Sequence, residues 1–103
     1  MIFRRRFADV ISRQLDVFAQ DESALLSEVR EAEQTYNRAE RAEAEEKYGD
    51  YVDVVETATE ALADMRDRFG RTLDDSTAEE YEAAFNRAVK RRWPPFGLEI
   101  ENR

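Results

Sequence analysis

Apolar side chains recur at steps of three and four residues along most of the chain, which is the period of an amphipathic helix. One such series comprises Leu25, Val29, Ala32, Tyr36 and Ala39, and a second comprises Tyr48, Tyr51, Val55, Ala58, Leu62, Met65 and Phe69. The two series are out of phase, because at ~100° per residue Ala39 and Tyr48 would lie on opposite faces of one continuous helix. We therefore predict a turn at Tyr48-Gly49-Asp50, where Gly49 ends one helix and Asp50 caps the next.

The same pattern, with its capping signals, predicts four helices, over 7–20, 21–48, 50–69 and 76–93, after an N-terminal arm over 1–6. Asp21 is expected to cap the second helix, and Ser76 to open a capping box for the fourth. The alternation of apolar and acidic residues near the C-terminus predicts an extended tail over 94–103. The predicted fold is a single domain, an all-α antiparallel bundle of about four helices, built on a long helical hairpin.

Composition supports the all-α class and removes several kinds of chemistry. The 103 residues include only three Gly and two Pro, too few for the many turns of an all-β fold. The chain has no Cys and no His, so it lacks thiol chemistry, the commonest general base and the commonest metal ligand. No apolar run approaches the ~20 residues of a membrane span, and no hydrophobic signal core follows Arg4 to Arg6. We expect a cytoplasmic protein.

The net charge of −8 is unevenly distributed along the chain. Residues 21–86 carry a charge of −13, whereas residues 1–20 carry +2 and residues 87–103 carry +3. An acidic centre of this size repels nucleic acid, so we expect neither nucleic acid nor a membrane as the main partner. The two basic ends instead predict contact with an acidic surface, either of the same chain or of a partner chain. Glu99 and Glu101, for example, could pair with Arg4 to Arg6.

The second predicted helix has a thin apolar seam, because Tyr36 is its only large seam residue after Val29. Small seam residues let a partner helix approach closely but bury little area, so this hairpin needs apolar surface from elsewhere. We therefore predict a homodimer, or a complex with another helical protein. The candidate interface residues are the large apolar side chains near the seam and the two ends: Phe3, Phe7, Tyr36, Trp93, Phe96, Leu98 and Ile100.

Three segments resemble motifs of the MazG-like nucleotide pyrophosphohydrolases, an all-α family. Residues 27–31 are similar to its Glu-Glu-x-x-Glu motif, with Ser27 in place of the first acid, and residues 47–50 to its Glu-x-Gly-Asp motif, with Lys47 in place of Glu. Residues 86–94 are similar to the Asn and basic residues that precede an aromatic–Pro pair. The resemblance implies that Glu28, Glu31 and Asp50 bind Mg²⁺, and that Asn86, Lys90 and Arg92 meet phosphates.

The leading functional prediction is a small acidic, non-enzymatic helical bundle that acts through protein–protein contacts and associates with itself. We assign it no catalytic residue, metal site or cofactor, because acid pairs three residues apart arise by chance in a chain with 24 acidic residues. One alternative is a divergent or degenerate MazG-like pyrophosphohydrolase that uses Mg²⁺. Another is contact with a membrane or nucleic acid through Arg4 to Arg6 and Lys90 to Arg92.

Overall fold

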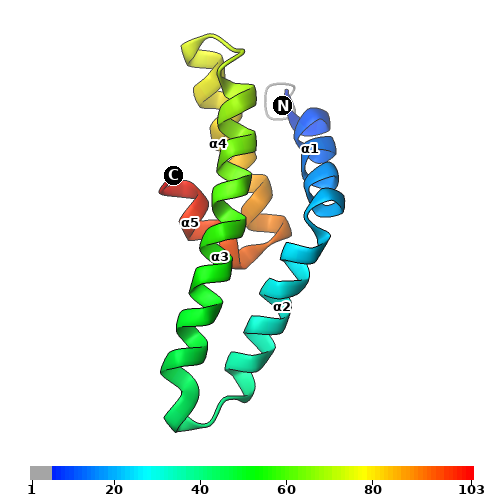
Figure 1. Ribbon diagram of the computed structural model, residues 1–103. Helices are drawn as coiled ribbons and strands as arrows, with labels where there is room; N and C mark the ends of the chain where they lie inside the picture. The colour runs from blue at the N-terminus through cyan, green and yellow to red at the C-terminus, as the bar shows by residue number, and fades with distance from the viewer. Residues whose placement is uncertain (1–5) are drawn as a thin grey trace.

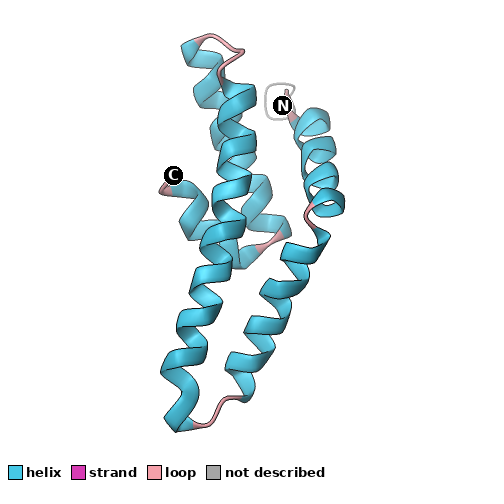
Figure 2. Cartoon of the chain, in the orientation of Figure 1, coloured by secondary structure: helices cyan, strands magenta, loops and turns pink. Residues whose placement is uncertain are grey.

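The computed structural model describes residues 6–103, and these residues form five α-helices and one short 3-10 helix (Figures 1 and 2). The α-helices are α1 (Ala8–Asp21), α2 (Ser23–Arg38), α3 (Arg41–Gly70), α4 (Asp75–Arg92) and α5 (Gly97–Glu101), and the 3-10 helix η2 (Pro94–Phe96) precedes α5. No strand occurs in this part of the chain. The predicted all-α fold built on a helical hairpin is confirmed, because α2 and α3 form the most extensive contact between helices.

The molecule is elongated, with principal extents of 50 × 25 × 24 Å. The antiparallel α2–α3 hairpin occupies one end, α4 and α5 pack against the other half of α3, and α1 packs against α4 (Figure 1). This second half holds the core, whose largest fully buried side chains come from α3, α4 and the C-terminal segment: Leu62, Tyr81, Phe85, Val89, Phe96 and Ile100. Helix α1 adds Ile11, Leu15 and Phe18 at helical spacing, so its amphipathic stripe faces this core.

Helix α3 runs without interruption through Gly49, so the turn predicted at Tyr48-Gly49-Asp50 is wrong. The chain turns instead at Ala39 and Glu40, whose ψ angles of 141° and 161° belong to extended backbone. The loss of phase that indicated a turn is real, but a break anywhere between Ala39 and Tyr48 accounts for it. Glycine commonly ends helices, which drew the prediction to Gly49. The second predicted helix therefore ends ten residues early, at Arg38, and α3 begins at Arg41.

The helix starts also differ from those predicted. Asp21, expected to cap the second helix, is the last residue of α1, and the N-cap position of α2 is Glu22. At α4 the cap is Asp74 rather than Ser76, because the Asp74 carboxylate accepts a hydrogen bond of 2.9 Å from the Thr77 amide. This hydrogen bond stabilises the ionised form and lowers the pKa of Asp74. An acidic side chain at this position also complements the helix dipole.

The C-terminal segment is helical, so the extended tail predicted over 94–103 is wrong. Phe96 and Ile100 are only 1% and 0% exposed, whereas Leu98 is 75% exposed. An extended segment would place all three side chains on one side, but a helix places residues four apart on one face and the residue between them elsewhere. The spacing of Phe96, the last residue of η2, and Ile100 on α5 therefore suits a helical segment, which docks both side chains into the core.

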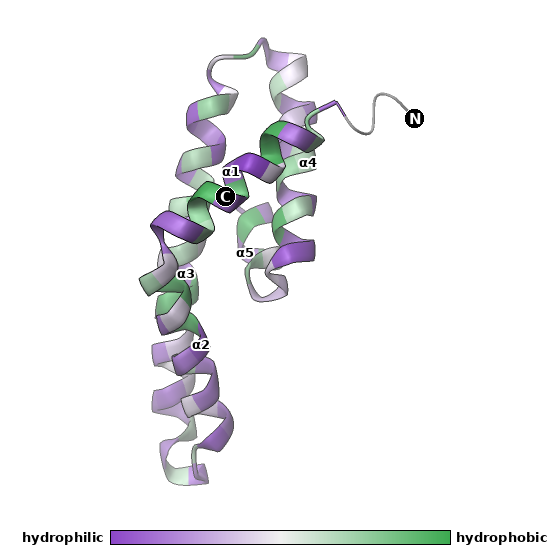
Figure 3. Cartoon of the chain, turned by 90° about the vertical axis from the view of Figure 1, so that its right-hand side faces the viewer, coloured by the Kyte–Doolittle hydropathy of each residue, from purple (hydrophilic) through white to green (hydrophobic). Residues whose placement is uncertain are grey.

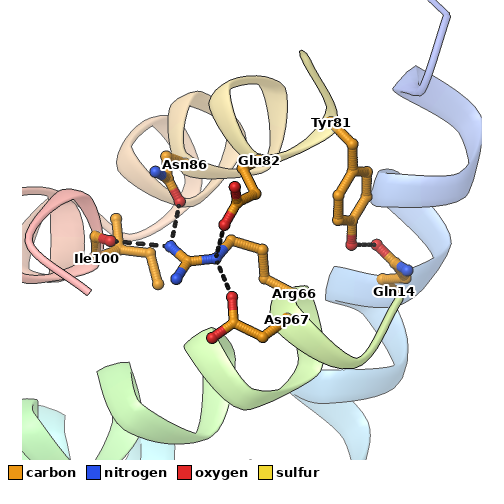
Figure 4. A network of polar contacts seen from close by, with 7 residues as sticks. All are labelled: Gln14, Arg66, Asp67, Tyr81, Glu82, Asn86 and Ile100. Atoms are coloured by element: carbon orange, nitrogen blue, oxygen red, sulfur yellow. Dashed lines mark hydrogen bonds and ion pairs between the residues drawn. The ribbon is translucent and has the colours of Figure 1, made fainter. Parts of the chain in front are cut away.

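A buried arginine, which sequence reasoning missed, holds α5 in place (Figure 4). Arg66 is 2% exposed, and its Nη1 donates hydrogen bonds of 3.0 Å to Asn86 Oδ1 on α4 and 3.0 Å to the Ile100 carbonyl oxygen. Its Nε donates to Asp67 Oδ1 at 2.9 Å and lies 3.6 Å from a carboxylate oxygen of Glu82. The only sequence signal was that Arg66 follows Leu62 by four residues, on the buried face of α3.

Among the helices of residues 6–103, none is long and apolar enough to cross a membrane.

Candidate protein-interaction site

A groove of about 820 Å³ runs between α1 and α4, and we call it the basic groove. Its walls are four residues of α1 and five of α4: Ala8, Ile11, Ser12 and Leu15, with Ala84, Arg87, Ala88, Arg91 and Arg92. Ile11 and Leu15 are almost fully buried, so they belong to the core beneath the groove. The surface of the groove therefore consists mainly of small side chains and arginines, a combination suited to a close-packed anionic partner.

The two walls of the groove are held together by an ion pair and by aromatic contacts. Arg92 of α4 donates a hydrogen bond of 2.7 Å to Asp16 of α1, and its guanidinium lies 4.9 Å from the ring centroid of Trp93. Trp93 in turn packs edge-on against Phe18 of α1, with ring centroids 5.7 Å apart. Since Arg92 is engaged within the chain, Arg87 and Arg91 are the arginines of the groove that can receive a partner.

Near the other end of α1, a buried tyrosine joins the same two helices. The Tyr81 hydroxyl donates a hydrogen bond of 2.8 Å to Gln14 Oε1 (Figure 4), and its ring meets that of Phe7 edge-on at 5.4 Å. Burial raises the pKa of Tyr81 to about 12. Tyr81 therefore stays neutral near physiological pH and acts as a structural contact between α1 and α4.

The second candidate surface is the outer half of the α2–α3 hairpin, residues 30–54, which we call the acidic arm. None of these residues is buried, although Val29 and Val55 on either side of them are. The arm carries eight acidic and four basic side chains, and Figure 3 shows this end of the hairpin mainly in the hydrophilic colour. A helical hairpin without a buried residue is stabilised only weakly by its own packing.

Three tyrosines hold the two helices of the arm together. The ring of Tyr36 on α2 lies 5.2 Å from that of Tyr48 and stacks 6.5 Å from that of Tyr51, both on α3. Partial burial, followed by the charge of Glu33, raises the pKa of Tyr51. Tyr48 remains 51% exposed. This aromatic cluster compensates in part for the small residues of the seam.

Three predicted interface residues, Phe7, Phe96 and Ile100, are buried in the core of the same chain. Phe3 lies outside the described residues. Leu98 is the most exposed of the set, at 75%, and it stands on the solvent side of α5. The burial of Phe7, Phe96 and Ile100 is thus explained within one chain, without a partner.

The remaining two predicted interface residues occupy different places. Trp93 is half-buried between Phe18 and Phe96 at the C-terminal end of α4, beside the basic groove. Tyr36 lies in the acidic arm. The pairing expected between the N-terminal arginines and the tail involves Arg4 and Arg5, which are outside the described residues, and Arg6, which pairs with Glu80 at 3.2 Å. The tail forms its own ion pair, Glu99 with Arg103 at 3.5 Å.

The structure also gathers the acidic residues of the first two MazG-like motifs. Glu28 and Glu31 on α2 and Asp50 on α3 line one pocket of about 260 Å³, together with Lys47. Within residues 6–103, however, no three carboxylates lie close enough together to hold a metal ion. The residues present therefore do not form the Mg²⁺ site that the resemblance implies.

The residues of the third motif are engaged elsewhere, and none of them lines the pocket of Glu28. Asn86 accepts a hydrogen bond from Arg66, and Arg92 pairs with Asp16 across the basic groove. Lys90 packs its aliphatic stem close to Gly97. The implied phosphate contacts are thus separated from the implied carboxylates.

Comparison with known proteins gives no family assignment: no family model matches the chain, and neither a curated protein nor a solved structure shows significant similarity to it.

Proposed function

We propose that this protein is non-enzymatic, that it acts through protein–protein contacts, and that it associates with a second copy of itself. The observation that best supports this proposal is the acidic arm, residues 30–54, in which no residue is buried. Most of the stability of a helix in a protein comes from the packing of an apolar face. A long hairpin with a thin seam therefore gains stability when another chain covers it.

Two features of the arm favour a protein partner. Tyr48 is half exposed although it is large and aromatic, and such side chains are enriched at the centres of protein interfaces. The arm is acidic, whereas Arg87 and Arg91 form a local basic patch in the other half of the molecule. Since the two charges lie on different parts of one chain, two copies can satisfy each other in a closed, symmetric contact.

The test of this proposal is the mass in solution, measured by light scattering over about 1 to 100 µM protein, where weak to moderate dimers form. We expect the mass to rise from the 12.1 kDa of one chain toward twice that value as the concentration increases. High salt should shift the transition to higher concentration, because charged surfaces contribute to the contact. A mass that stays at 12.1 kDa throughout would contradict the proposal.

A second candidate function, a divergent nucleotide pyrophosphohydrolase, is favoured by one observation: Glu28, Glu31 and Asp50 line the same pocket. Binding of Mg²⁺ there would require the three carboxylates to move closer together than they are in this structure. Its test is the release of pyrophosphate from nucleoside triphosphates in the presence of Mg²⁺ or Mn²⁺, with the melting temperature measured in parallel. Glu31→Gln should abolish both the activity and any metal-dependent rise in melting temperature, while Glu79→Gln on α4 should leave both unchanged. Absence of activity, or activity that survives Glu31→Gln, would exclude this assignment of the pocket.

A further inference from the structure

The basic groove lies between two helices, and small side chains on both walls would admit a third helix. On α1, Ala8 and Ser12 are four residues apart, and on α4 the same spacing separates Ala84 from Ala88. Residues at this spacing lie on one face of a helix, so each wall of the groove presents a row of small side chains. Small side chains lower the ridges of a helix surface and let the backbone of another helix come close.

The charge of the groove selects an acidic helix. Arg87 and Arg91 are one helical turn apart, ~6 Å along the axis, and both are exposed. Within residues 6–103 neither forms an ion pair. Two adjacent cations at the edge of a groove attract carboxylates that follow the same helical spacing.

Such a helix face exists in the chain itself, on the side of α3 that faces solvent. Exposed residues recur there at steps of three and four, and six of them form one face: Ala42, Glu45, Glu46, Gly49, Asp53 and Glu56. Four of these residues are acidic and the other two are small. The face therefore matches the groove in both respects, because its carboxylates can meet Arg87 and Arg91 while Ala42 and Gly49 permit close approach.

Gly49 is the most informative residue of this face. Glycine in a helix interior costs about 1 kcal/mol relative to alanine, and Gly49 has no positive φ angle that would require it. No neighbouring atom among residues 6–103 comes within 4 Å of the place where a Cβ would stand. Packing within one chain thus gives no reason for glycine, whereas close approach of a second chain does.

We infer that the outer face of α3 from one copy docks in the basic groove of a second copy, and that the contact is reciprocal. This inference rests on the proposed self-association and names its two surfaces. The acidic arm forms one end of the long axis of the molecule, and α1 and α4, whose residues line the groove, lie in the other half (Figure 1). A two-fold axis perpendicular to that long axis brings each arm to the groove of the other copy, so the contact closes as a dimer and does not extend into a filament.

A charge-swap experiment tests the inference with two double variants. The groove variant carries Arg87→Glu and Arg91→Glu, and the arm variant carries Glu46→Lys and Asp53→Lys. Each variant alone places like charges in both contacts, so we expect its dimer dissociation constant to rise about tenfold or more. An equimolar mixture restores opposite charges in both contacts, and we expect a heterodimer with nearly the affinity of the wild-type dimer. A control variant, Arg68→Glu with Arg71→Glu, reverses two exposed arginines outside the groove and should leave the dimer unchanged.

Each outcome of the experiment has a distinct meaning. If the wild-type chain is monomeric, the proposed self-association is itself wrong. A wild-type dimer whose mass is unaffected by both variants leaves self-association in place and overturns this inference. Circular dichroism checks that each variant is helical. If the groove variant does not fold, a milder variant with Arg87→Gln and Arg91→Gln replaces it, and it should still weaken the dimer. Duplex DNA that binds the wild-type chain but not the groove variant, while all dimers stay intact, would assign the groove to nucleic acid and overturn the inference.

Discussion

The guanidinium of Arg66 lies 3.0 Å from the backbone carbonyl oxygen of Ile100, thirty-four residues later in the chain. The last carbonyl groups of a helix lack the usual partners within the helix, and the Ile100 oxygen otherwise accepts only a long hydrogen bond of 3.3 Å from the Arg103 amide, so this charged donor supplies its stronger contact. The same Nη1 atom donates to Asn86, and one side chain of α3 therefore connects α4 and α5 (Figure 4). This contact explains why a segment of only five residues is helical and docked.

Arg66→Met should lower the free energy of unfolding by about 2 kcal/mol, because the buried Ile100 carbonyl then loses its charged donor. Urea unfolding measures this change. Arg68→Met on the same helix is the control, and since Arg68 is exposed it should have little effect. Equal effects of the two substitutions would show that the contact with Ile100 contributes nothing specific.

Gly49→Ala should raise the free energy of unfolding of the monomer by about 1 kcal/mol, since α3 is helical at this position and a Cβ meets open space. Gly97→Ala should be destabilising, because a Cβ there would stand 2.9 Å from Cγ of Lys90. Thermal unfolding at low protein concentration compares the two. Destabilisation by Gly49→Ala would indicate that the chain turns at Gly49 after all.

The stability of the wild-type chain should fall between about pH 10 and pH 12. The unfolded chain releases the Tyr81 proton near pH 10, whereas the folded chain retains it up to a pKa of about 12. The unfolded state therefore binds fewer protons than the folded state in this range. Ionisation of Tyr81 should lower the free energy of unfolding by about 2 kcal/mol. Tyr81→Phe should lower stability at pH 8 by about 1 kcal/mol, through loss of the hydrogen bond with Gln14. The difference in the free energy of unfolding between the wild-type chain and Tyr81→Phe, measured against pH, must shrink or reverse above pH 10. A difference that stays constant would contradict the raised pKa of Tyr81.

Tyr36→Ala should loosen the acidic arm and leave the core intact. Tyr36 supplies the ring that packs on both Tyr48 and Tyr51, and aromatic pairs of this kind contribute about 1 kcal/mol each. Trypsin cleavage after Arg38 and Arg41 should become about tenfold faster, because the turn between the helices opens more often. Tyr36→Phe keeps the ring and should cleave at the wild-type rate. If Tyr36→Ala also does so, the aromatic cluster does not hold the arm.

Helical periodicity predicts the elements of this chain well where they carry a full apolar stripe. The helices predicted over 7–20 and 76–93 differ by one residue at each end from α1 and α4. The turn at Ala39 and Glu40 could not be located, because neither residue is a helix breaker and the position depends on how Tyr36 packs against α3. The helical tail was missed because the sequence fits two patterns equally well. Phe96, Leu98 and Ile100 alternate as in an extended strand, whereas Phe96 and Ile100 alone have the four-residue spacing of a helix face.

The candidate surfaces were only partly predictable. The acidic centre and the basic ends are visible in the sequence, and they predicted complementary contact. The basic groove, by contrast, exists because α1 packs beside α4. Residues that meet across it, such as Asp16 and Arg92, lie more than seventy positions apart in the sequence. Such long-range pairing leaves no local signal in the chain. Arg66 was missed for a related reason, since a charged residue on an apolar face is buried only when distant groups such as Ile100 can satisfy it.

The most direct test of the central claim is amide hydrogen exchange of residues 30–54 at two protein concentrations, one below and one above the dimer transition found by light scattering. If a second copy covers the acidic arm, exchange of these amides should slow at the higher concentration, most strongly along α3 from Ala42 to Glu56. Amides of the core around Leu62 and Phe85 serve as the reference, since they are buried within one chain. Exchange in the arm that is the same at both concentrations would contradict the claim that this surface is where two copies meet.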